Sequence, residues 1–205
     1  MQLPGKNYCA ILVDMIRLQS VELITLENIA EQKLIQDLVV RPLKVNKDES
    51  GILVETLRKD WVDVYGEKRD FSMQYYSITP PGLARDEDVW HCHPVQEDRM
   101  LVVSGAIVLA VADKRKDSST KDSINLFHMD SEKPYMVLVP ANTLHGFMVV
   151  SKDKATLLNF PTALYNPNEE GRVPYSQANV VLEDGTPFSW GKVREKFAST
   201  SYDEK

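Results

Sequence analysis

Three of the four histidines in this 205-residue chain fall in two short segments, "VWHCHP" (residues 89–94) and "PANTLHGF" (140–147). His91 and His93 are separated by one residue, so on a β-strand their side chains point to the same face. His145 comes much later, in a segment that could form a neighbouring strand. Imidazole groups gathered in this way can transfer protons near neutral pH or bind a metal ion.

Two acidic residues, Glu97 and Asp98, follow the first pair of histidines. They fall at the start of the next expected strand, where a turn would bring one of them beside the imidazoles. Histidine and carboxylate side chains together are donors suited to Zn, Mn, Fe or Ni. If the protein binds a divalent metal, the expected ligands are His91, His93, Asp98 (or Glu97) and His145.

Short strands must position these side chains. From Leu38 to Asn159 the chain alternates between segments rich in β-branched and aromatic residues and turn-rich polar segments. The strand-like segments include "GILVETLR" (51–58), "FSMQYYSI" (71–78) and "RMLVVSGAIVLAVAD" (99–113). Many short strands in one chain predict a mainly β protein that forms a sandwich or barrel, such as a jelly roll.

The two ends of the chain have different patterns. Over residues 16–35 the apolar residues recur at roughly helical spacing without Pro or Gly, which predicts one or two helices. We therefore expect residues 1–36 to form a helical appendage and residues 37–197 to form the barrel with a C-terminal wrap. The segment "WGKVREKF" (190–197) predicts a short helix, and residues 198–205 are expected to form a flexible tail.

Composition excludes several classes of function. With 43% hydrophobic and 26% charged residues, the chain reads as a globular protein with a sizeable core. Its net charge of −6, with acidic and basic residues intermixed, argues against binding to nucleic acid. The apolar run "YCAILVDMI" (8–16) is too short to cross a bilayer and has no signal-peptide pattern. Cys9 and Cys92 give no disulfide framework, so we expect a cytoplasmic protein without a membrane partner.

The histidine segments resemble the two motifs of the cupin superfamily. The segment "HCHPVQEDRMLVVSG" (91–105) has the order His-x-His, acidic residue and glycine of the first motif, at a spacing that favours Asp98 over Glu97. The segment "PANTLH" (140–145) resembles the second motif, although Asn142 stands where glycine is usual. This resemblance implies a cupin jelly-roll β-barrel.

A narrower resemblance extends from Leu38 to Trp190. The segments that carry it are "VRPLKVNKDESGILVETLR" (40–58), "VLVPANTLHGFMVVS" (137–151), "YNPNEEGRVPY" (165–175) and "FSW" (188–190). They are similar to dTDP-4-dehydrorhamnose 3,5-epimerase and its relatives. That resemblance implies a homodimer that acts on a nucleotide-sugar and makes activated deoxysugars for polysaccharides. It also implies that no metal or other cofactor is required.

The resemblance implies roles for four residues. In that family a His base removes the proton beside the 4-keto group, an Asp orients the His, a Lys steadies the enolate, and a Tyr returns a proton on the other face. Matched to this sequence, His91 falls on the catalytic base. The matching substrate-binding residues are Glu55, Gln74 and His145.

Other positions of this chain depart from the family pattern. Asp98 stands at the Lys position and Asn159 at the Tyr position. The position of the orienting Asp aligns best with Ser176, and Ser50 replaces an Arg. The implied fold does not depend on these positions, whereas the implied reaction does.

Three functions remain open on the sequence. The leading one is an epimerase acting on a 4-keto-6-deoxyhexose nucleotide, with His91 as the base. The second is a metal-dependent cupin enzyme that uses the three-histidine cluster with Zn, Mn, Fe or Ni. The third is a sugar-binding cupin without catalysis. Bound metal would distinguish the second, and hydrogen exchange between substrate and solvent would separate the first from the third.

Overall fold

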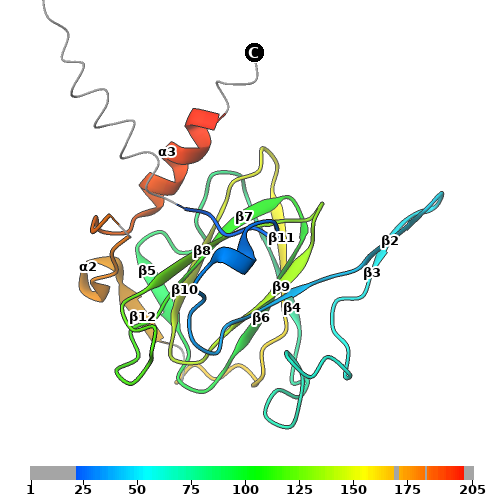
Figure 1. Ribbon diagram of the computed structural model, residues 1–205, viewed down its shortest axis with the longest axis horizontal. Coiled ribbons are helices and arrows are strands. Elements are labelled where there is room, and N and C mark those ends of the chain that lie inside the picture. Colours follow the sequence, from blue (N-terminus) through cyan, green and yellow to red (C-terminus); the bar gives the residue numbers. More distant parts are fainter. Residues whose placement is uncertain (1–21, 169–170, 183, 201–205) are drawn as a thin grey trace, which may run out of the picture.

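Two five-stranded antiparallel sheets form the body of the protein (Figure 1). In the computed structural model, the described residues are 22–168, 171–182 and 184–200. The first sheet contains, in spatial order, β1 (Val39–Pro42), β9 (Tyr135–Val139), β6 (Asp98–Ser104), β11 (Ala155–Asn159) and β4 (Tyr75–Thr79). The second contains β12 (Gly171–Pro174), β5 (Val89–Cys92), β10 (Leu144–Val149), β7 (Ala106–Ala112) and β8 (Ile124–Asp130). This arrangement confirms the mainly β, cupin jelly-roll fold.

The main core is built by apolar residues of both sheets. Successive side chains on a strand point to opposite faces, so each strand buries every second residue between the sheets. The first sheet contributes Met100, Val137 and Leu157, and the second contributes Leu109 and Phe147, all buried. Their packing sets the separation of the sheets, and therefore the separation of any polar groups carried on facing strands.

The turn between β6 and β7 depends on a glycine. Gly105 has a φ of +73°, in the left-handed region that favours glycine. A Cβ atom there would lie 2.8 Å from Ser151 Oγ and 2.9 Å from the carbonyl oxygen of Lys154. The glycine expected from the motif is therefore required where the chain passes from the first sheet to the second.

Residues 22–36 run along the barrel and contribute to its core. Ile24 forms a parallel bridge with Phe127 of β8. Ile24 and Ile35 are 3% and 1% exposed and belong to the main core. The helical content of this segment is the short 3-10 helix η1 (Ile29–Glu31). The predicted helix is therefore wrong for the described part of this segment, because an extended path buries the same apolar residues; the first residues of that prediction lie outside the described part.

The C-terminal segment packs on the outer face of the second sheet. The rings of Trp90 in β5 and Phe188 lie 4.9 Å apart, and Trp190 continues the cluster with its ring 5.0 Å from that of Phe188. Two helices follow β12, α2 (Tyr175–Ala178) and α3 (Trp190–Thr200). The predicted C-terminal helix is confirmed and continues into the expected tail, whose last residues lie outside the described part of the chain. Among the described residues, no helix has the length and apolar character needed to span a membrane.

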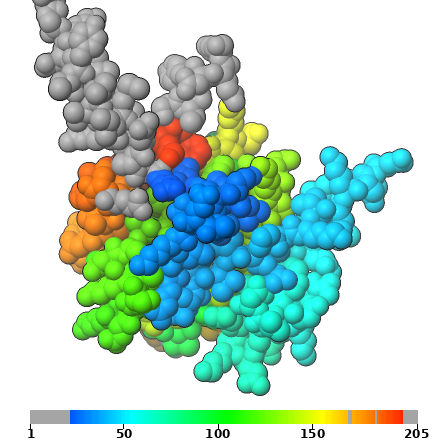
Figure 2. All heavy atoms as spheres, in the orientation of Figure 1, coloured from blue at the N-terminus to red at the C-terminus, as the bar shows by residue number. Residues whose placement is uncertain are grey.

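A two-stranded hairpin projects from the barrel, drawn in cyan in Figures 1 and 2. Its strands β2 (Val45–Asp48) and β3 (Gly51–Val54) pair with each other and, within the described residues, with no other strand. Ile52 and Leu53 of β3 are 65% and 62% exposed. Exposed apolar side chains on a projecting element are typical of a protein interface.

Candidate functional site

A cavity of about 570 Å³ lies between the two sheets. Strands β4, β6 and β11 of the first sheet and β5 and β10 of the second contribute to its lining. The three histidines singled out from the sequence, His91, His93 and His145, all line this cavity together with Asp98. Its size and its convergent polar groups are those of a small-molecule site.

His91 is held by an acidic partner from the preceding loop. It lies on β5, and its Nε2 atom is 2.5 Å from Oδ2 of Asp86. Both residues line the cavity and both are half-buried. Ser176, at the aligned position of the orienting Asp, is exposed on α2. The carboxylate that contacts His91 in this chain is therefore that of Asp86, which the alignment of motifs had not indicated.

Further contacts fix the loop that carries Asp86. The hydroxyl of Tyr175 donates to the backbone oxygen of Asp86 at 3.4 Å, and Trp190 Nε1 donates to that hydroxyl at 2.7 Å. Strand β12 pairs with β5 so that Arg172 is directly opposite His91, and Arg172 Nη1 lies 3.5 Å from Asp86 Oδ1. The C-terminal wrap thus positions the His91–Asp86 pair.

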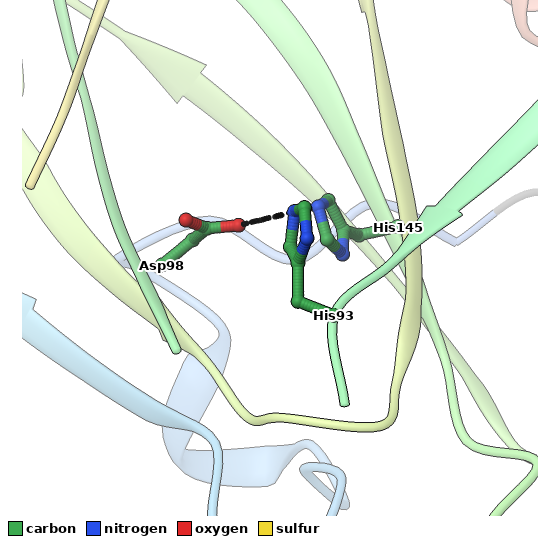
Figure 3. Close-up of side chains that lie close together, drawn as sticks. All are labelled: His93, Asp98 and His145. Atoms are coloured by element: carbon green, nitrogen blue, oxygen red, sulfur yellow. Dashed lines mark ion pairs between the residues drawn. The ribbon is translucent and has the colours of Figure 1, made fainter. Parts of the chain in front are cut away.

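A second polar group forms deeper in the barrel, from three elements (Figure 3). Asp98 begins β6, His93 follows β5, and His145 lies on β10. Asp98 Oδ2 is 3.4 Å from His93 Nε2 and 3.3 Å from His145 Nε2. One potential ligand atom from each residue falls within 4.8 Å of the other two, an arrangement that could hold a metal ion. His91 is outside this group, because its Nε2 faces Asp86.

Asp98 is buried and remains ionised. Its side chain is 1% exposed. Burial by itself raises the pKa of Asp98, but the hydrogen bond with His145 and the charges of His145 and His93 outweigh burial and lower the pKa to about 2. Glu97, the alternative acidic residue, instead forms an ion pair with Arg69 at 2.7 Å. The structure thus places Asp98, and not Glu97, beside the histidines.

The loop after β5 is held in place by Asn142. This residue has a φ of +60°, in the left-handed region that asparagine tolerates better than other non-glycine residues. Its backbone N–H donates to the oxygen of His93 at 2.8 Å, and its Nδ2 donates to the oxygen of Pro94 at 2.9 Å. Asparagine can therefore replace the usual glycine here, and it also positions His93.

Asn159 and Tyr75 form a second departure from the family pattern. They are paired across β11 and β4. Asn159 Nδ2 lies 2.8 Å from the Tyr75 hydroxyl and 2.8 Å from Asp98 Oδ1. Tyr75 lines the cavity, so a phenol group is present next to the strand position where the resemblance implied one. This residue was not predicted, although "QYYS" in a strand-like segment offered two tyrosines of opposite orientation.

Two predicted substrate-binding residues lie outside this cavity. Glu55 is exposed after β3 and forms an ion pair with Arg58 at 2.8 Å. Gln74 is exposed just before β4. Within one chain, neither joins His91 and His145 in lining the cavity. Their role in substrate binding stays a prediction.

The outer part of the cavity offers groups for an anionic ligand. Arg85 and Arg172 supply positive charge, and Leu164 and Tyr165 supply exposed apolar and aromatic surface. Arginine is suited to phosphate groups because its planar guanidinium can donate two parallel hydrogen bonds. This combination could bind a ligand that carries phosphate groups next to a flat ring.

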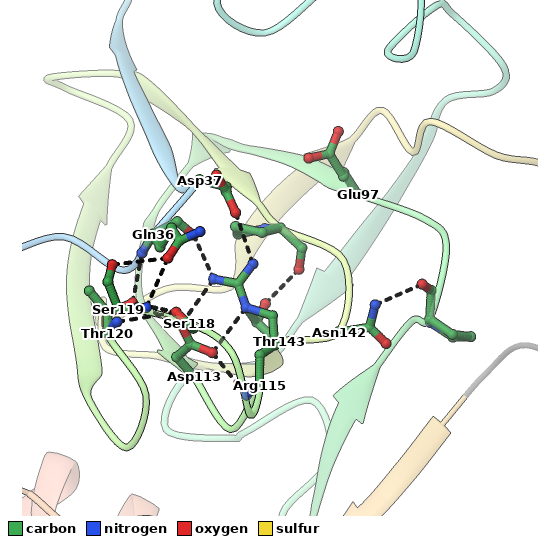
Figure 4. Close-up of polar contacts among 12 residues, drawn as sticks. Gln36, Asp37, Glu97, Asp113, Arg115, Ser118, Ser119, Thr120, Asn142 and Thr143 are labelled. Carbon is green, nitrogen blue, oxygen red and sulfur yellow. Dashed lines mark hydrogen bonds and ion pairs between the residues drawn. The ribbon is translucent and has the colours of Figure 1, made fainter.

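A separate polar cluster outside the cavity is structural (Figure 4). Asp113 is fully buried and accepts hydrogen bonds from the side chains of Arg115, Ser118 and Thr120. Arg115 also pairs with Asp37, at 3.1 Å. Burial raises the pKa of Asp113, but these hydrogen bonds lower it overall, well below its usual value. The cluster fastens the loop after β7 to the N-terminal segment.

Comparisons with known sequences agree on one family. The model of one family, described as dTDP-4-dehydrorhamnose 3,5-epimerase, matches residues 32–190. A probable low-salt glycan biosynthesis epimerase of Haloferax volcanii is 38% identical over 145 residues, which cover 69% of this chain and 88% of that relative. A spore coat polysaccharide biosynthesis protein of Bacillus subtilis is 26% identical over 157 residues, 76% of this chain and 99% of that protein.

Solved structures show the same fold. A dTDP sugar isomerase of Desulfovibrio desulfuricans superposes with a TM-score of 0.65 at 20% identity, covering 78% of this chain and 96% of that one. An epimerase of Legionella pneumophila in complex with dTDP-4-keto-L-rhamnose has a TM-score of 0.62 at 23% identity, covering 69% and 75%. Both likenesses support the jelly-roll architecture.

Proposed function

Because the chain belongs to the dTDP-4-dehydrorhamnose 3,5-epimerase family, we propose that it is an isomerase acting on a 4-keto-6-deoxyhexose nucleotide. It would invert at least one carbon next to the keto group. The observation that carries this proposal is the pair formed by His91 and Asp86 in the wall of the cavity, with 2.5 Å between Nε2 and Oδ2. The names of two relatives, a glycan biosynthesis epimerase and a spore coat polysaccharide biosynthesis protein, support a role in polysaccharide biosynthesis.

The His91–Asp86 pair suits removal of a proton from carbon. A C–H group beside a ketone is acidic because the resulting carbanion is delocalised onto the keto oxygen as an enolate. In the proposed reaction His91 accepts this proton. Asp86 holds the imidazole in one orientation and stabilises the imidazolium that forms.

Inversion also requires that a proton return to the opposite face of the sugar ring. His91 is on β5 of the second sheet, whereas Tyr75 is on β4 of the first. Both line the cavity, so they approach a bound sugar from different walls. We assign the returning proton to the Tyr75 hydroxyl, which Asn159 Nδ2 orients at 2.8 Å. A phenol on β4 would then replace the phenol that the family pattern places on β11.

The enolate oxygen and the nucleotide diphosphate need positive or hydrogen-bonding groups. In the proposed complex, Arg85 and Arg172 contact the diphosphate at the outer part of the cavity. The sugar then lies deeper, against His91 and the neighbouring group formed by His93, Asp98 and His145. This order keeps the reacting carbons near the base and leaves the nucleoside near Tyr165.

We also propose that the protein is a homodimer. Support comes from the projecting β2–β3 hairpin, whose Ile52 and Leu53 are mostly exposed, and from β1, which forms an edge of the first sheet. An edge strand presents unpaired backbone groups that a second chain can cover. Glu55 directly follows this hairpin, so its predicted role in substrate binding would be played near the dimer interface.

Solvent exchange tests the proposed reaction directly. The protein is incubated in D2O with dTDP-4-keto-6-deoxyglucose, and deuterium in the sugar is located by NMR. We expect incorporation at a carbon next to the keto group, and loss of incorporation in His91→Ala. Binding of the nucleotide-sugar by wild type without any incorporation would overturn the proposal and indicate a sugar-binding protein instead.

A further inference from the structure

We propose that Arg99 is a positioning residue for inversion, because it fastens together the strand ends that carry Tyr75 and Asn159. The inference rests on the proposed epimerase function, in which the Tyr75 hydroxyl returns the proton. Asp98 and Arg99 are consecutive residues of β6, so their side chains point to opposite faces of the first sheet. Asp98 lines the cavity, whereas Arg99 is fully buried on the other face.

The guanidinium of Arg99 donates hydrogen bonds to five backbone carbonyl oxygens. These belong to Phe160 at 2.7 Å, Arg69 at 2.8 Å, Val64 and Asp70 at 3.2 Å, and Pro161 at 3.4 Å. A guanidinium has five N–H donors, so each donor has an acceptor here. Burial lowers the pKa of Arg99, but the group stays protonated, and the five oxygens stabilise its charge. Removing the guanidinium would leave these carbonyl groups without this partner in a largely buried position.

Four of the five oxygens lie close in sequence to Tyr75 or Asn159. Residues 160–161 directly follow Asn159, the last residue of β11. Residues 69–70 come shortly before Tyr75, the first residue of β4. Since Tyr75 and Asn159 are paired across these two strands, Arg99 joins the start of β4 to the end of β11 at the site of the proposed acid.

Strand β4 is at the end of the first sheet, where its pairing can open. It pairs with β11, and no other strand of the described part of the chain covers its second edge. Terminal segments with few neighbours open locally at a lower free energy than central strands. Opening at Tyr75 would move the phenol relative to a bound sugar. Asp98 holds the Asn159 side chain from the cavity side at 2.8 Å and Arg99 holds the outer side, so two consecutive residues of β6 oppose that opening.

The ratio of two products separates positioning from a purely structural role. In D2O with dTDP-4-keto-6-deoxyglucose, return of a deuteron by His91 gives deuterated, unepimerised substrate, whereas return by Tyr75 gives epimerised product. Loss of folded protein lowers both amounts equally and leaves their ratio unchanged. Lysine keeps the charge of Arg99 but has three donors on one nitrogen instead of a planar fork. We expect Arg99→Lys to raise the ratio of deuterated substrate to epimerised product by more than about tenfold, because a small misplacement of a reacting group is costly.

Arg41→Lys is the matched control, because it makes the same change at another arginine of the first sheet. Arg41 lies on β1, at the opposite end of the sheet from β4. Its Nη1 pairs with Asp63 at 2.6 Å, and its guanidinium carbon lies 4.3 Å from the centre of the Trp61 ring, so it also fastens a segment that covers the sheet. We expect this control to keep the wild-type product ratio, even where its melting temperature falls.

A double variant tests whether Arg99 acts through Tyr75. Once the phenol hydroxyl is absent, its position no longer matters, so Tyr75→Phe/Arg99→Lys should show the product ratio of Tyr75→Phe alone. Additive effects in the double variant, or a wild-type ratio in Arg99→Lys, would overturn the proposal. Where Arg99→Lys does not fold, Arg99→Gln, which loses the charge but keeps an amide donor, is measured in the same way.

Backbone amide exchange separates this proposal from the epimerase function, because it requires no substrate. Wild type and Arg99→Lys are compared by mass spectrometry of peptides from the full-length protein. We expect faster amide exchange in the variant over residues 69–76 and 159–162, and unchanged exchange over β7. Unchanged amide exchange over residues 69–76 would overturn the clamp, whatever reaction the protein catalyses. Absence of deuterium in the sugar with wild type would instead overturn the epimerase function and the role of Arg99 in inversion, while the clamp is judged by the amides alone.

Discussion

Asn159 Nδ2 donates a hydrogen bond of 2.8 Å to Oδ1 of Asp98. These two residues stand at the positions where the family pattern has a Tyr and a Lys, so the two departures are in direct contact rather than independent. A lysine ammonium has no acceptor site, whereas a carboxylate accepts the amide hydrogen that asparagine donates. The pair therefore forms one altered unit, which places a negative charge beside His93 and His145.

Substitutions of the proposed base and its partner should separate their roles. We expect His91→Ala to lower kcat by about 10²–10⁴-fold, the usual contribution of a general base. Asp86→Asn keeps the size of the side chain but loses its charge, and should lower kcat by more than about tenfold. Steady-state rates measured by coupled product analysis check both, with Asp88→Asn in the same exposed loop as the control. Equal rates for Asp86→Asn and Asp88→Asn would contradict the assignment of Asp86.

Tyr75→Phe should uncouple proton removal from inversion. His91 would still exchange the proton next to the keto group with solvent, but no acid would return a proton on the opposite face. NMR should then show deuterium in unepimerised substrate and little epimerised product. Tyr165→Phe is the comparison, because Tyr165 is another exposed phenol in the lining of the cavity. Loss of inversion in Tyr165→Phe alone would move the acid to that residue.

Charges on the β2–β3 hairpin should disrupt the proposed dimer. Light scattering of wild type at micromolar concentration is expected to give about twice the chain mass of 23.3 kDa. Ile52→Asp/Leu53→Asp places two carboxylates on exposed apolar positions and should shift the mass toward one chain. Val62→Asp, at a residue 85% exposed outside the hairpin, should leave the mass unchanged. A single-chain mass for wild type would refute the homodimer.

Because of Asp113, the free energy of unfolding should decrease as the pH is lowered into the acid range. Its pKa is lowered in the folded protein, so its contribution is fully present above the unfolded pKa of about 4. That contribution is lost as pH falls through the lower folded pKa. We expect Asp113→Asn to lower the free energy of unfolding by roughly 2–4 kcal/mol at pH 7 and to make it less dependent on pH in the acid range. Urea unfolding between pH 7 and pH 2 measures both, and Asp117→Asn, exposed in the same loop, should resemble wild type.

Several features of the site could be predicted because they depend on local spacing. The His-x-His pair and the later histidine lie on strands that pair with each other, with His145 directly opposite His91. Side chains alternate between the two faces of a strand, so residues two apart share a face. Pairing of the two strands was then enough to predict that these side chains lie close together. The glycine at 105 was predictable for a similar reason, since it is required by a tight turn.

Contacts made by loops were not predictable in the same way. Asp86 precedes His91 by five residues in the acidic segment "RDEDVW", where three carboxylates have equal claim on sequence grounds. The choice among them is made by long-range contacts. The Tyr175 hydroxyl and Arg172, which follow in the chain by almost ninety residues, hold Asp86, whereas Glu87 pairs with Arg194. Long-range packing of this kind leaves no periodic signal.

The N-terminal segment shows how tertiary structure overrides a local pattern. Ile24 and Ile35 fit a helical stripe, yet both are buried while the backbone of Ile24 bonds to β8. Apolar residues at roughly helical spacing can also be buried by an extended chain that bends across a barrel. Strand β8 has a weak sequence pattern for the converse reason, since "INLFHMD" has polar residues at positions where the N-terminal segment covers it.

The packed core between the two sheets sets the distance between the side chains to which we assign proton removal and proton return. His91 and Tyr75 belong to opposite sheets, so the width available to a sugar ring is set by buried residues such as Met100, Phe147 and Leu157, which also line the cavity. Changing the volume of one of these residues alters that width by a fraction of an ångström while leaving the base and the acid intact. We therefore expect that a change of core volume at these positions alters which carbon the proposed reaction inverts, without any change in the reactive groups.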